Sequence, residues 1–186
     1  SCGDGHCPLG SSGYFTNSYT YDFGAGACTD DCFFNISDNP VFTLDTFSVV
    51  AWVWVNTTGL AAEDHKILSF CGTPNTPYAN YGLTTDDTGQ VGKMRYGCNT
   101  GSGWTAVYSN TRVDQDPYNG TWIHVAMVKE NGNVNFYLNG QNDGSPATPA
   151  SCQSPIDPTC DIYIGDEATT TTEGWNGLID ELAIFN

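Results

Sequence analysis

The stretch TWIHVAMVKENGNVNFYLNGQ, residues 121–141, limits most strongly what this chain can fold into. Apolar and polar residues alternate with a period of two on both sides of Asn131-Gly132, which is typical of two strands that each bury one face. Asn-Gly supplies the positive φ angles that a two-residue hairpin turn requires. The apolar face of such a hairpin needs a second sheet to cover it. The stretch therefore predicts two packed antiparallel β-layers.

The rest of the chain carries further strand patterns and no extended helical period. The strongest is FSVVAWVWVN, residues 47–56, which is apolar on both faces and therefore predicts a central strand. Further strands are expected at 18–23, 33–36, 66–71, 81–85, 92–98, 105–108, 161–165 and 178–185. About ten strands without helices predict an all-β protein, a sandwich or a barrel.

The charge of the chain excludes two classes of partner. Among its 186 residues are 21 acidic and five basic ones, which gives a formal net charge of −16. Such a balance repels phosphate backbones and anionic membranes, so neither nucleic acid nor a membrane surface is an expected partner. No apolar run reaches the ~18 residues of a membrane span, and membrane insertion is not expected. The acidity suits cation binding, for example Ca²⁺, or an ordinary solvated surface.

The cysteines indicate disulfide bonds in an oxidising compartment. There are eight of them and no C-x-x-C, and three histidines are too few for a zinc framework. Cys71 and Cys98 end two strand patterns and are expected to pair across neighbouring strands. Cys152 and Cys160 are expected to close the short loop between them. The remaining pairing, among Cys2, Cys7, Cys28 and Cys32, stays open between three connectivities.

The N-terminus and the sequons suggest an extracellular protein. Residues 1–13 are rich in Gly and Cys and predict an extension or linker before a single domain over 14–186. No signal peptide is visible, so we expect a mature or excised segment of a secreted or cell-surface protein. The triplets at Asn35, Asn56 and Asn119 predict N-glycosylation if the source is a eukaryote.

Four motifs carry a family resemblance: FSVVAWVWV (47–55), the hairpin at 121–141, IYIGD (162–166) and WNGLIDELAIFN (175–186). In this order they resemble the laminin-G-like, or concanavalin A-like lectin/glucanase, jelly-roll family, and YDFGAG (21–26) resembles the family's opening segment. The resemblance covers residues 18–186 and implies a two-sheet antiparallel β-sandwich. The segment GACTDDC and the number of cysteines depart from the family pattern. The family includes lectins, polysaccharide-binding modules, protein-binding ectodomains and glucanases, so its fold does not fix an activity.

The acidic residues argue against catalysis. Retaining glycosidases hold two carboxylates about 5–5.5 Å apart, and the glucanase relatives carry Glu-x-Asp-x-x-Glu on one strand. The acids at 86–87 and 180–181 are adjacent and so point to opposite faces of a strand. Asp161 and Asp166 lie five residues apart. We therefore expect no catalytic residues and no enzyme, with a glycoside hydrolase relative as a distant alternative.

Aromatic residues in loop-like segments are the candidate ligand contacts, because aromatic rings stack on the apolar faces of sugars. The candidates are Trp104, Tyr108, Tyr78, Tyr81 and Trp175. Trp104 is the strongest, because glycines flank it and leave it little core to fill; Trp175 has the alternative of plugging a loop end. The favoured function is non-catalytic recognition of an extracellular glycan or glycoprotein. The alternative is a structural or adhesive subunit of a glycoprotein filament or matrix, which acts through protein contacts including self-association.

The resemblance also implies a structural calcium ion that ties the opening strand to the closing strand. Asp22 in YDFG and Asp180 in LIDEL occupy the matching positions, and Asp30 and Asp31 lie nearby in sequence. Carboxylate oxygens are the ligands that Ca²⁺ prefers. The alternative is that Asp22 and Asp180 are ordinary turn or cap residues.

Overall fold

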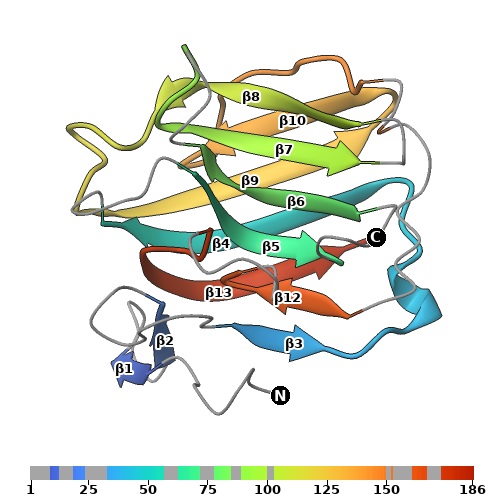
Figure 1. Cartoon of the computed structure of the whole chain (residues 1–186). Helices are drawn as coiled ribbons and strands as arrows, with labels where there is room; N and C mark the ends of the chain where they lie inside the picture. Colours follow the sequence, from blue (N-terminus) through green and yellow to red (C-terminus); the bar gives the residue numbers. More distant parts are fainter. Residues whose placement is uncertain are drawn as a thin grey trace.

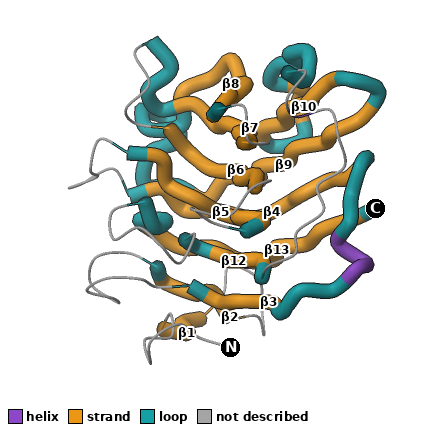
Figure 2. Tube along the Cα trace, turned by 45° about the vertical axis from the view of Figure 1, so that its right-hand side comes forward, coloured by secondary structure: helices purple, strands orange, loops and turns teal. Residues whose placement is uncertain are grey.

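The chain forms a sandwich of two antiparallel β-sheets (Figures 1 and 2). The computed structural model describes residues 9–12, 19–23, 33–56, 63–71, 78–84, 89–99, 103–149, 152, 161–166 and 173–186. The seven-stranded sheet has the order β1 (Leu9–Ser12), β2 (Tyr19–Asp22), β13 (Gly177–Phe185), β4 (Phe47–Val55), β9 (Trp122–Glu130), β10 (Asn133–Leu138) and β11 (Gln141–Asn142). The six-stranded sheet has the order β3 (Phe34–Ile36), β12 (Ile162–Ile164), β5 (Asp64–Phe70), β6 (Tyr78–Thr84), β7 (Lys93–Asn99) and β8 (Trp104–Arg112). The predicted all-β, two-sheet fold is confirmed.

Helical structure is minor in this fold. A short 3₁₀ helix lies at Pro40–Phe42, and Cys152 also has 3₁₀ conformation. The described part of the chain contains no helix that combines the length and the apolar character needed to cross a membrane.

Strand β4 occupies the central position that its sequence predicts. It lies between β13 and β9, and the side chains of Phe47, Val49, Ala51, Val53 and Val55 are almost completely buried against the other sheet. The intervening side chains are half-buried on the outer face. The sequence of β4 is apolar on both faces because one face lies in the core and the other face is partly covered.

The hairpin predicted within residues 121–141 is confirmed as β9 and β10. Asn131 and Gly132 both have positive φ, 48° and 75°, which matches a two-residue turn between Glu130 and Asn133. Asn139 and Gly140 repeat this conformation, with φ of 49° and 78°, between β10 and the short β11. The two tight turns therefore fix the register of β9, β10 and β11.

The opening and closing strands lie side by side, as expected. Asp22 of β2 pairs with Leu178 of β13, so segments from both ends of the chain meet in the seven-stranded sheet. Residues Leu9–Ser12, which the sequence assigns to an N-terminal extension, form β1 at the edge of this sheet. The sequence LGSS has no alternation and did not predict a strand.

The predicted disulfide pairing of Cys71 with Cys98 and of Cys152 with Cys160 is wrong. Cys98 is bonded to Cys152, with a Cα–Cα distance of 5.8 Å. The physical reason is the strand order: β6 lies between β5, which Cys71 follows, and β7, which contains Cys98. Two strand spacings of about 4.8 Å exceed the Cα separation that a disulfide spans.

The bonding of the other cysteines is described only in part. Cys71 is also disulfide-bonded, and its partner is outside the described residues. Cys2, Cys7, Cys28, Cys32 and Cys160 lie outside the described residues as well. Their connectivity therefore stays open.

Candidate functional site

The outer face of the six-stranded sheet carries an unusual set of polar residues. In-register pairs place Lys66, Gly82, Arg95 and Tyr108 in one row across β5, β6, β7 and β8. A second row consists of Ser69, Asn80, Gly97 and Ala106, and Trp104 stands opposite Asn99 beyond it. We call Asn80, Arg95, Gly97, Trp104, Ala106 and Tyr108 the Trp104 patch.

The opposite side of the same strands is the core. Phe70 and Tyr96 make edge-to-face ring contacts with Phe47 of β4, at centroid distances of 5.5 and 6.3 Å. Since side chains alternate along a strand, the neighbours of Tyr96 in β7, Arg95 and Gly97, point to the outer face. The Trp104 patch is therefore a distinct surface of the sheet and is not part of the inter-sheet core.

Arg95 is the centre of the Trp104 patch. Its side chain is 1% exposed, and its guanidinium forms an ion pair with Asp64 and donates a hydrogen bond to Asn80 Oδ1 at 2.8 Å. The guanidinium carbon lies 4.5 Å from the ring centroid of Trp104, which is a cation–π contact. A buried charge needs such compensation, so these contacts fix the position of Arg95.

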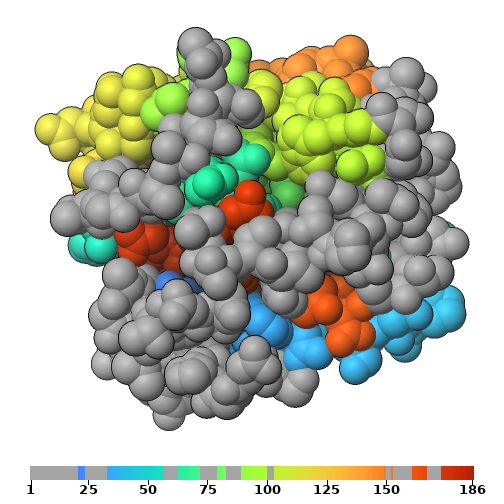
Figure 3. All heavy atoms as spheres, viewed as in Figure 1, coloured from blue at the N-terminus to red at the C-terminus, as the bar shows by residue number. Residues whose placement is uncertain are grey.

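The absence of a side chain at Gly97 leaves the space in which Trp104 lies against Arg95. A Cβ atom at Gly97 would overlap the indole of Trp104 and come within 2.9 Å of the Arg95 guanidinium. Glycine thus allows the indole to lie across β7 while Trp104 remains 38% exposed. Figure 3 shows part of the β7–β8 region at the molecular surface, in lime green. The arrangement presents a supported aromatic ring to a ligand.

Basic residues in this protein are almost all neutralised locally. Four of the five form ion pairs: Lys66 with Glu173, Arg95 with Asp64, Arg112 with Asp114, and Lys129 with Asp45. The hydrogen bond from Arg112 to Asp114 raises the pKa of the Arg112 guanidinium. Lys93, the fifth, donates to the side-chain oxygen of Gln90 at 3.1 Å. Together with the net charge of −16, this pairing disfavours an anionic ligand.

The predicted ligand contacts divide into two groups. Trp104 and the half-buried Tyr108 lie together on the outer face of β8, and Trp104 is the first residue of that strand rather than part of a loop. Tyr81 and Trp175 are each 1% exposed, so their prediction as ligand contacts is wrong. The side chain of Tyr78 lies outside the described residues.

Tyr81 and Trp175 are buried for specific reasons. Tyr81 lies within β6, and its inward side chain stacks on Phe136 at a centroid distance of 6.4 Å; burial raises the pKa of its hydroxyl. Trp175 belongs to the core, and its indole nitrogen donates to the carbonyl of Leu178 at 3.3 Å. Both residues contribute packing, as large aromatic side chains usually do.

The outer face of the seven-stranded sheet carries paired aromatic rings. Trp54 and Trp122 are cross-strand neighbours with ring centroids 6.2 Å apart, and Trp52 and His124 are neighbours at 5.4 Å. All four side chains are half-buried. His124 has a packing role against Trp52 on this face.

Two of the four predicted calcium ligands, Asp22 and Asp180, are among the residues that the structure describes. Asp22 lies on β2 and Asp180 lies on the adjacent strand β13. Asp22 pairs with Leu178, and Leu178 and Asp180 are two residues apart in β13, so all three side chains are on the same face of the sheet. On the other side of β13, Leu178 pairs with Trp54 and Asp180 pairs with Trp52. Asp180 is 6% exposed, and its Oδ1 accepts a hydrogen bond from the Glu181 amide at 2.9 Å. Diagonal positions of this kind place Cβ atoms about 7–8 Å apart or somewhat less. The two side chains are thus diagonal neighbours on one face of the sheet.

Two carboxylates do not complete a calcium site, which needs six to eight oxygen ligands. Among the residues that the structure describes, no three His, Cys, Asp or Glu side chains are grouped to hold a metal. Asp30 and Asp31 lie outside the described residues. The described residues therefore offer two neighbouring carboxylates and do not by themselves make up a full set of calcium ligands.

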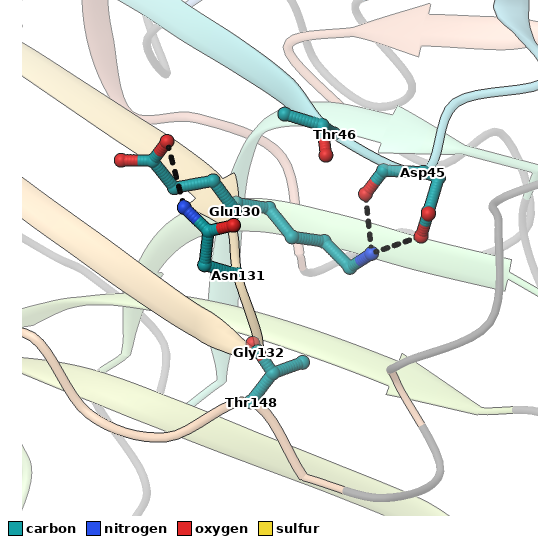
Figure 4. Close-up of a pocket in the computed structure, with 7 residues that line it drawn as sticks. Asp45, Thr46, Glu130, Asn131, Gly132 and Thr148 are labelled. Carbon is teal, nitrogen blue, oxygen red and sulfur yellow. Dashed lines mark hydrogen bonds and ion pairs between the residues drawn. The ribbon is translucent and has the colours of Figure 1, made fainter.

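A polar pocket of about 320 Å³ lies at the turn of the β9–β10 hairpin (Figure 4). Its lining is Asp45, Thr46, Lys129, Glu130, Asn131, Gly132 and Thr148. The Lys129 ammonium is nearly buried and donates to the Asp45 carbonyl at 2.6 Å. None of the described residues that line this pocket is aromatic. Its contacts fasten the segment before β4 to the hairpin, so we assign it a structural role.

An apolar pocket of about 190 Å³ lies where the two sheets meet at β2, β3, β12 and β13. Tyr21, Phe23 and Phe34 form its aromatic wall through edge-to-face contacts at 4.8 and 6.0 Å. Asp180 is at its rim. The pocket is the open edge of the sandwich core.

Comparison with known families identifies a matching model over most of the chain. The model described as the concanavalin A-like lectin/glucanases superfamily, a laminin G model, matches residues 30–186. A comparison with curated protein sequences found no match.

Solved structures share the fold at low sequence identity. Domain 4 of a GH43 extracellular arabinanase from Geobacillus stearothermophilus, in complex with arabinotriose, is 19% identical, with a TM-score of 0.63 over 95% of this chain and 74% of that one. Domains LG4-5 of the mouse laminin α1 chain are 15% identical, with a TM-score of 0.64 over 96% of this chain and 44% of that one. The CBM40 of Ruminococcus gnavus IT-sialidase, bound to α2,6 sialyllactose, is 17% identical, with a TM-score of 0.56 over 78% of each chain. This chain thus spans less than half of the laminin structure and about three quarters of the two others.

Proposed function

Because the chain belongs to the concanavalin A-like lectin/glucanases superfamily, we propose that it is a non-catalytic module that binds a neutral extracellular glycan through the Trp104 patch. The observation that carries this proposal is the supported, exposed indole of Trp104 beside polar groups of the same sheet face. Sugar-binding surfaces combine an aromatic face with a few fixed polar groups. We also propose that the chain acts outside the cell, at the cell surface or after secretion.

The structural neighbours support a sugar as the ligand class. The arabinanase domain holds arabinotriose and the CBM40 holds sialyllactose. Their low identity to this chain transfers the fold and no individual contact. The choice of a neutral glycan instead rests on this chain's own charges, because its acidic surface and paired bases disfavour a carboxylated or sulfated sugar.

The acid pairs considered for catalysis support a non-catalytic role. Asp161 and Asp166 lie on either side of β12, and Asp161 receives hydrogen bonds from Asn35 and from the amide of Asp38. Asp180 is followed by a bulge in β13 that turns Glu181, with φ of 52°, out of the regular strand. Asp86 and Asp87 lie outside the described residues. We assign none of these acids a role in hydrolysis.

Truncation of Trp104 tests the binding proposal. A screen of wild-type protein on an array of neutral oligosaccharides identifies a ligand, and calorimetry measures its affinity. Trp104→Ala should weaken that affinity by roughly tenfold or more, since buried aromatic contacts dominate binding energy. Tyr108→Ala should weaken it less, because Tyr108 is more buried than Trp104.

The matched control is Tyr21→Ala. Tyr21 is 39% exposed, close to the value for Trp104, but it belongs to the other sheet and should leave the affinity unchanged. Equal loss in both variants would contradict the assignment of the site. A protein that binds no oligosaccharide and instead assembles into particles in light scattering would favour the alternative of an adhesive or structural subunit. The exposed edge strand β8 would then be the first candidate contact.

We further propose that Asp22 and Asp180 take part in a structural calcium site. When bound, the ion would supply a cross-link between β2 and β13, and these residues would provide carboxylate ligands. Calcium at a hundredfold excess over its Kd should raise the melting temperature by roughly 5–10 °C. Asp180→Asn should remove this shift, whereas the exposed Asp38→Asn should retain it. An identical melting temperature in calcium and in chelator would refute the site.

A further inference from the structure

Two N-glycosylation triplets meet at one end of the seven-stranded sheet. Asn56 follows the last residue of β4 and Asn119 lies in the turn before β9, and both side chains are exposed. The amide of Gly120 donates to the carbonyl of Val55 at 3.2 Å, which joins the two segments. The two asparagines are therefore neighbours in the fold although they are far apart in the sequence.

An aromatic pair stands next to these asparagines. Trp54 and Trp122 face each other directly across β4 and β9, and their half-buried rings meet edge to face. Asn56 follows Trp54 by two residues. Its backbone N–H donates a hydrogen bond to the carbonyl of Asn176, and this bond continues the pairing of β4 with the segment before β13. In extended backbone, residues two apart project to the same side. A group attached to Asn56 therefore emerges beside the indole of Trp54.

We propose that Asn56 and Asn119 are N-glycosylated and that the first N-acetylglucosamine on Asn56 packs against the Trp54–Trp122 pair. The apolar face of a sugar ring is complementary to an indole. Thr58 and Thr121 complete the two triplets. The packed sugar would cover part of these two half-buried rings.

The modification is an ordinary group transfer from a lipid-linked oligosaccharide diphosphate. The amide nitrogen Nδ2 of the asparagine attacks the anomeric carbon of the first sugar, and the bond from that carbon to the diphosphate oxygen breaks. The lipid diphosphate leaves with the bonding electron pair, and one amide proton passes to a base. The host secretory pathway supplies both the donor and the transferase.

The third triplet provides an internal comparison. Asn35 is half-buried in β3, and its Nδ2 donates to Asp161 Oδ2 at 2.8 Å. A glycan on this nitrogen would have to be accommodated beside Tyr163, which pairs with Asn35. We therefore expect lower occupancy at Asn35 than at Asn56 and Asn119.

Secretion of the chain from insect cells followed by glycopeptide mass spectrometry tests the modification. For the packing, the glycans are trimmed to a single N-acetylglucosamine, and melting temperatures are compared with and without Asn56→Gln. Loss of the sugar should lower the melting temperature by roughly 2–4 °C in the wild-type background and leave it unchanged in Trp54→Ala. Unglycosylated protein from bacteria shows the effect of Asn56→Gln without any sugar and serves as the control.

An NMR measurement covers the case in which Trp54→Ala does not fold. The N-acetyl protons of the first sugar should shift upfield in the glycosylated wild-type protein, because they lie near the indole ring. Secreted protein with Asn56 unmodified would overturn the proposal. So would a sugar on Asn56 whose N-acetyl protons resonate as in a free glycopeptide.

Discussion

Arg95→Met is expected to destabilise the protein by about 3–5 kcal/mol, because it leaves the largely buried Asp64 without its partner. The side chain of Asp64 is 18% exposed in the ion pair and 1% of Arg95 is exposed, so little water is available to replace the lost contact. The variant also removes the hydrogen bond to Asn80 and the cation that lies against Trp104. Equilibrium unfolding in urea measures the loss.

Two further variants separate the causes. Arg112→Met breaks an ion pair in which the arginine side chain is 43% exposed, and it should cost no more than about 1 kcal/mol. The double variant Arg95→Met with Asp64→Leu removes both charges and should recover most of the lost stability. Its affinity for glycan should remain lower than that of the wild type, because Trp104 has lost its contact with the Arg95 guanidinium. A cost for Arg95→Met no larger than that for Arg112→Met would show that the buried charge pair is not important for stability.

Removal of the Cys98–Cys152 disulfide should cost about 4 kcal/mol. The bond joins residues 54 positions apart, and a cross-link of this span reduces the chain entropy of the unfolded state by about that amount. It ties β7, which carries the arginine of the Trp104 patch, to a segment that follows β11. The double variant Cys98→Ala with Cys152→Ala leaves no unpaired thiol at either position, and urea unfolding again reports the difference.

Peptide mapping without reduction provides the matching covalent test. A peptide pair linked through Cys98 and Cys152 is expected. A link from Cys71 to Cys98 would contradict the structure and restore the pairing that the sequence alone suggested. A double variant as stable as the wild type would show that the bond contributes little to the folded state.

The strand pattern was predictable because it follows from local alternation. Residues 47–55 and 121–141 contain their own periodicity and turn residues, so the central strand and the hairpin could be placed without knowledge of the rest. The pairing of Cys98 depended instead on the order of strands within the sheet, which alternation does not determine. Strand β1 was missed because LGSS has neither period nor bulk.

The candidate site was predicted only in part, for similar reasons. Trp104 stands out in the sequence because glycines flank it, but the importance of Arg95 depends on Asp64, Asn80 and Trp104, which come from three other strands. One signal for Arg95 was available: a charged residue alternates with Met94 and Tyr96 in a strand pattern, which marks a polar outer face. Tyr81 also alternates, but alternation alone did not show which side of β6 faces the core.

The structure of a complex tests the central claim most directly. Deglycosylated protein would be crystallised with the neutral oligosaccharide that binds best on the array. We predict a sugar ring in contact with the indole of Trp104, with polar contacts to neighbouring groups of the Trp104 patch. A sugar bound in the pocket beside Lys129 or on the face of Trp52 and Trp54, with Trp104 untouched, would contradict the account.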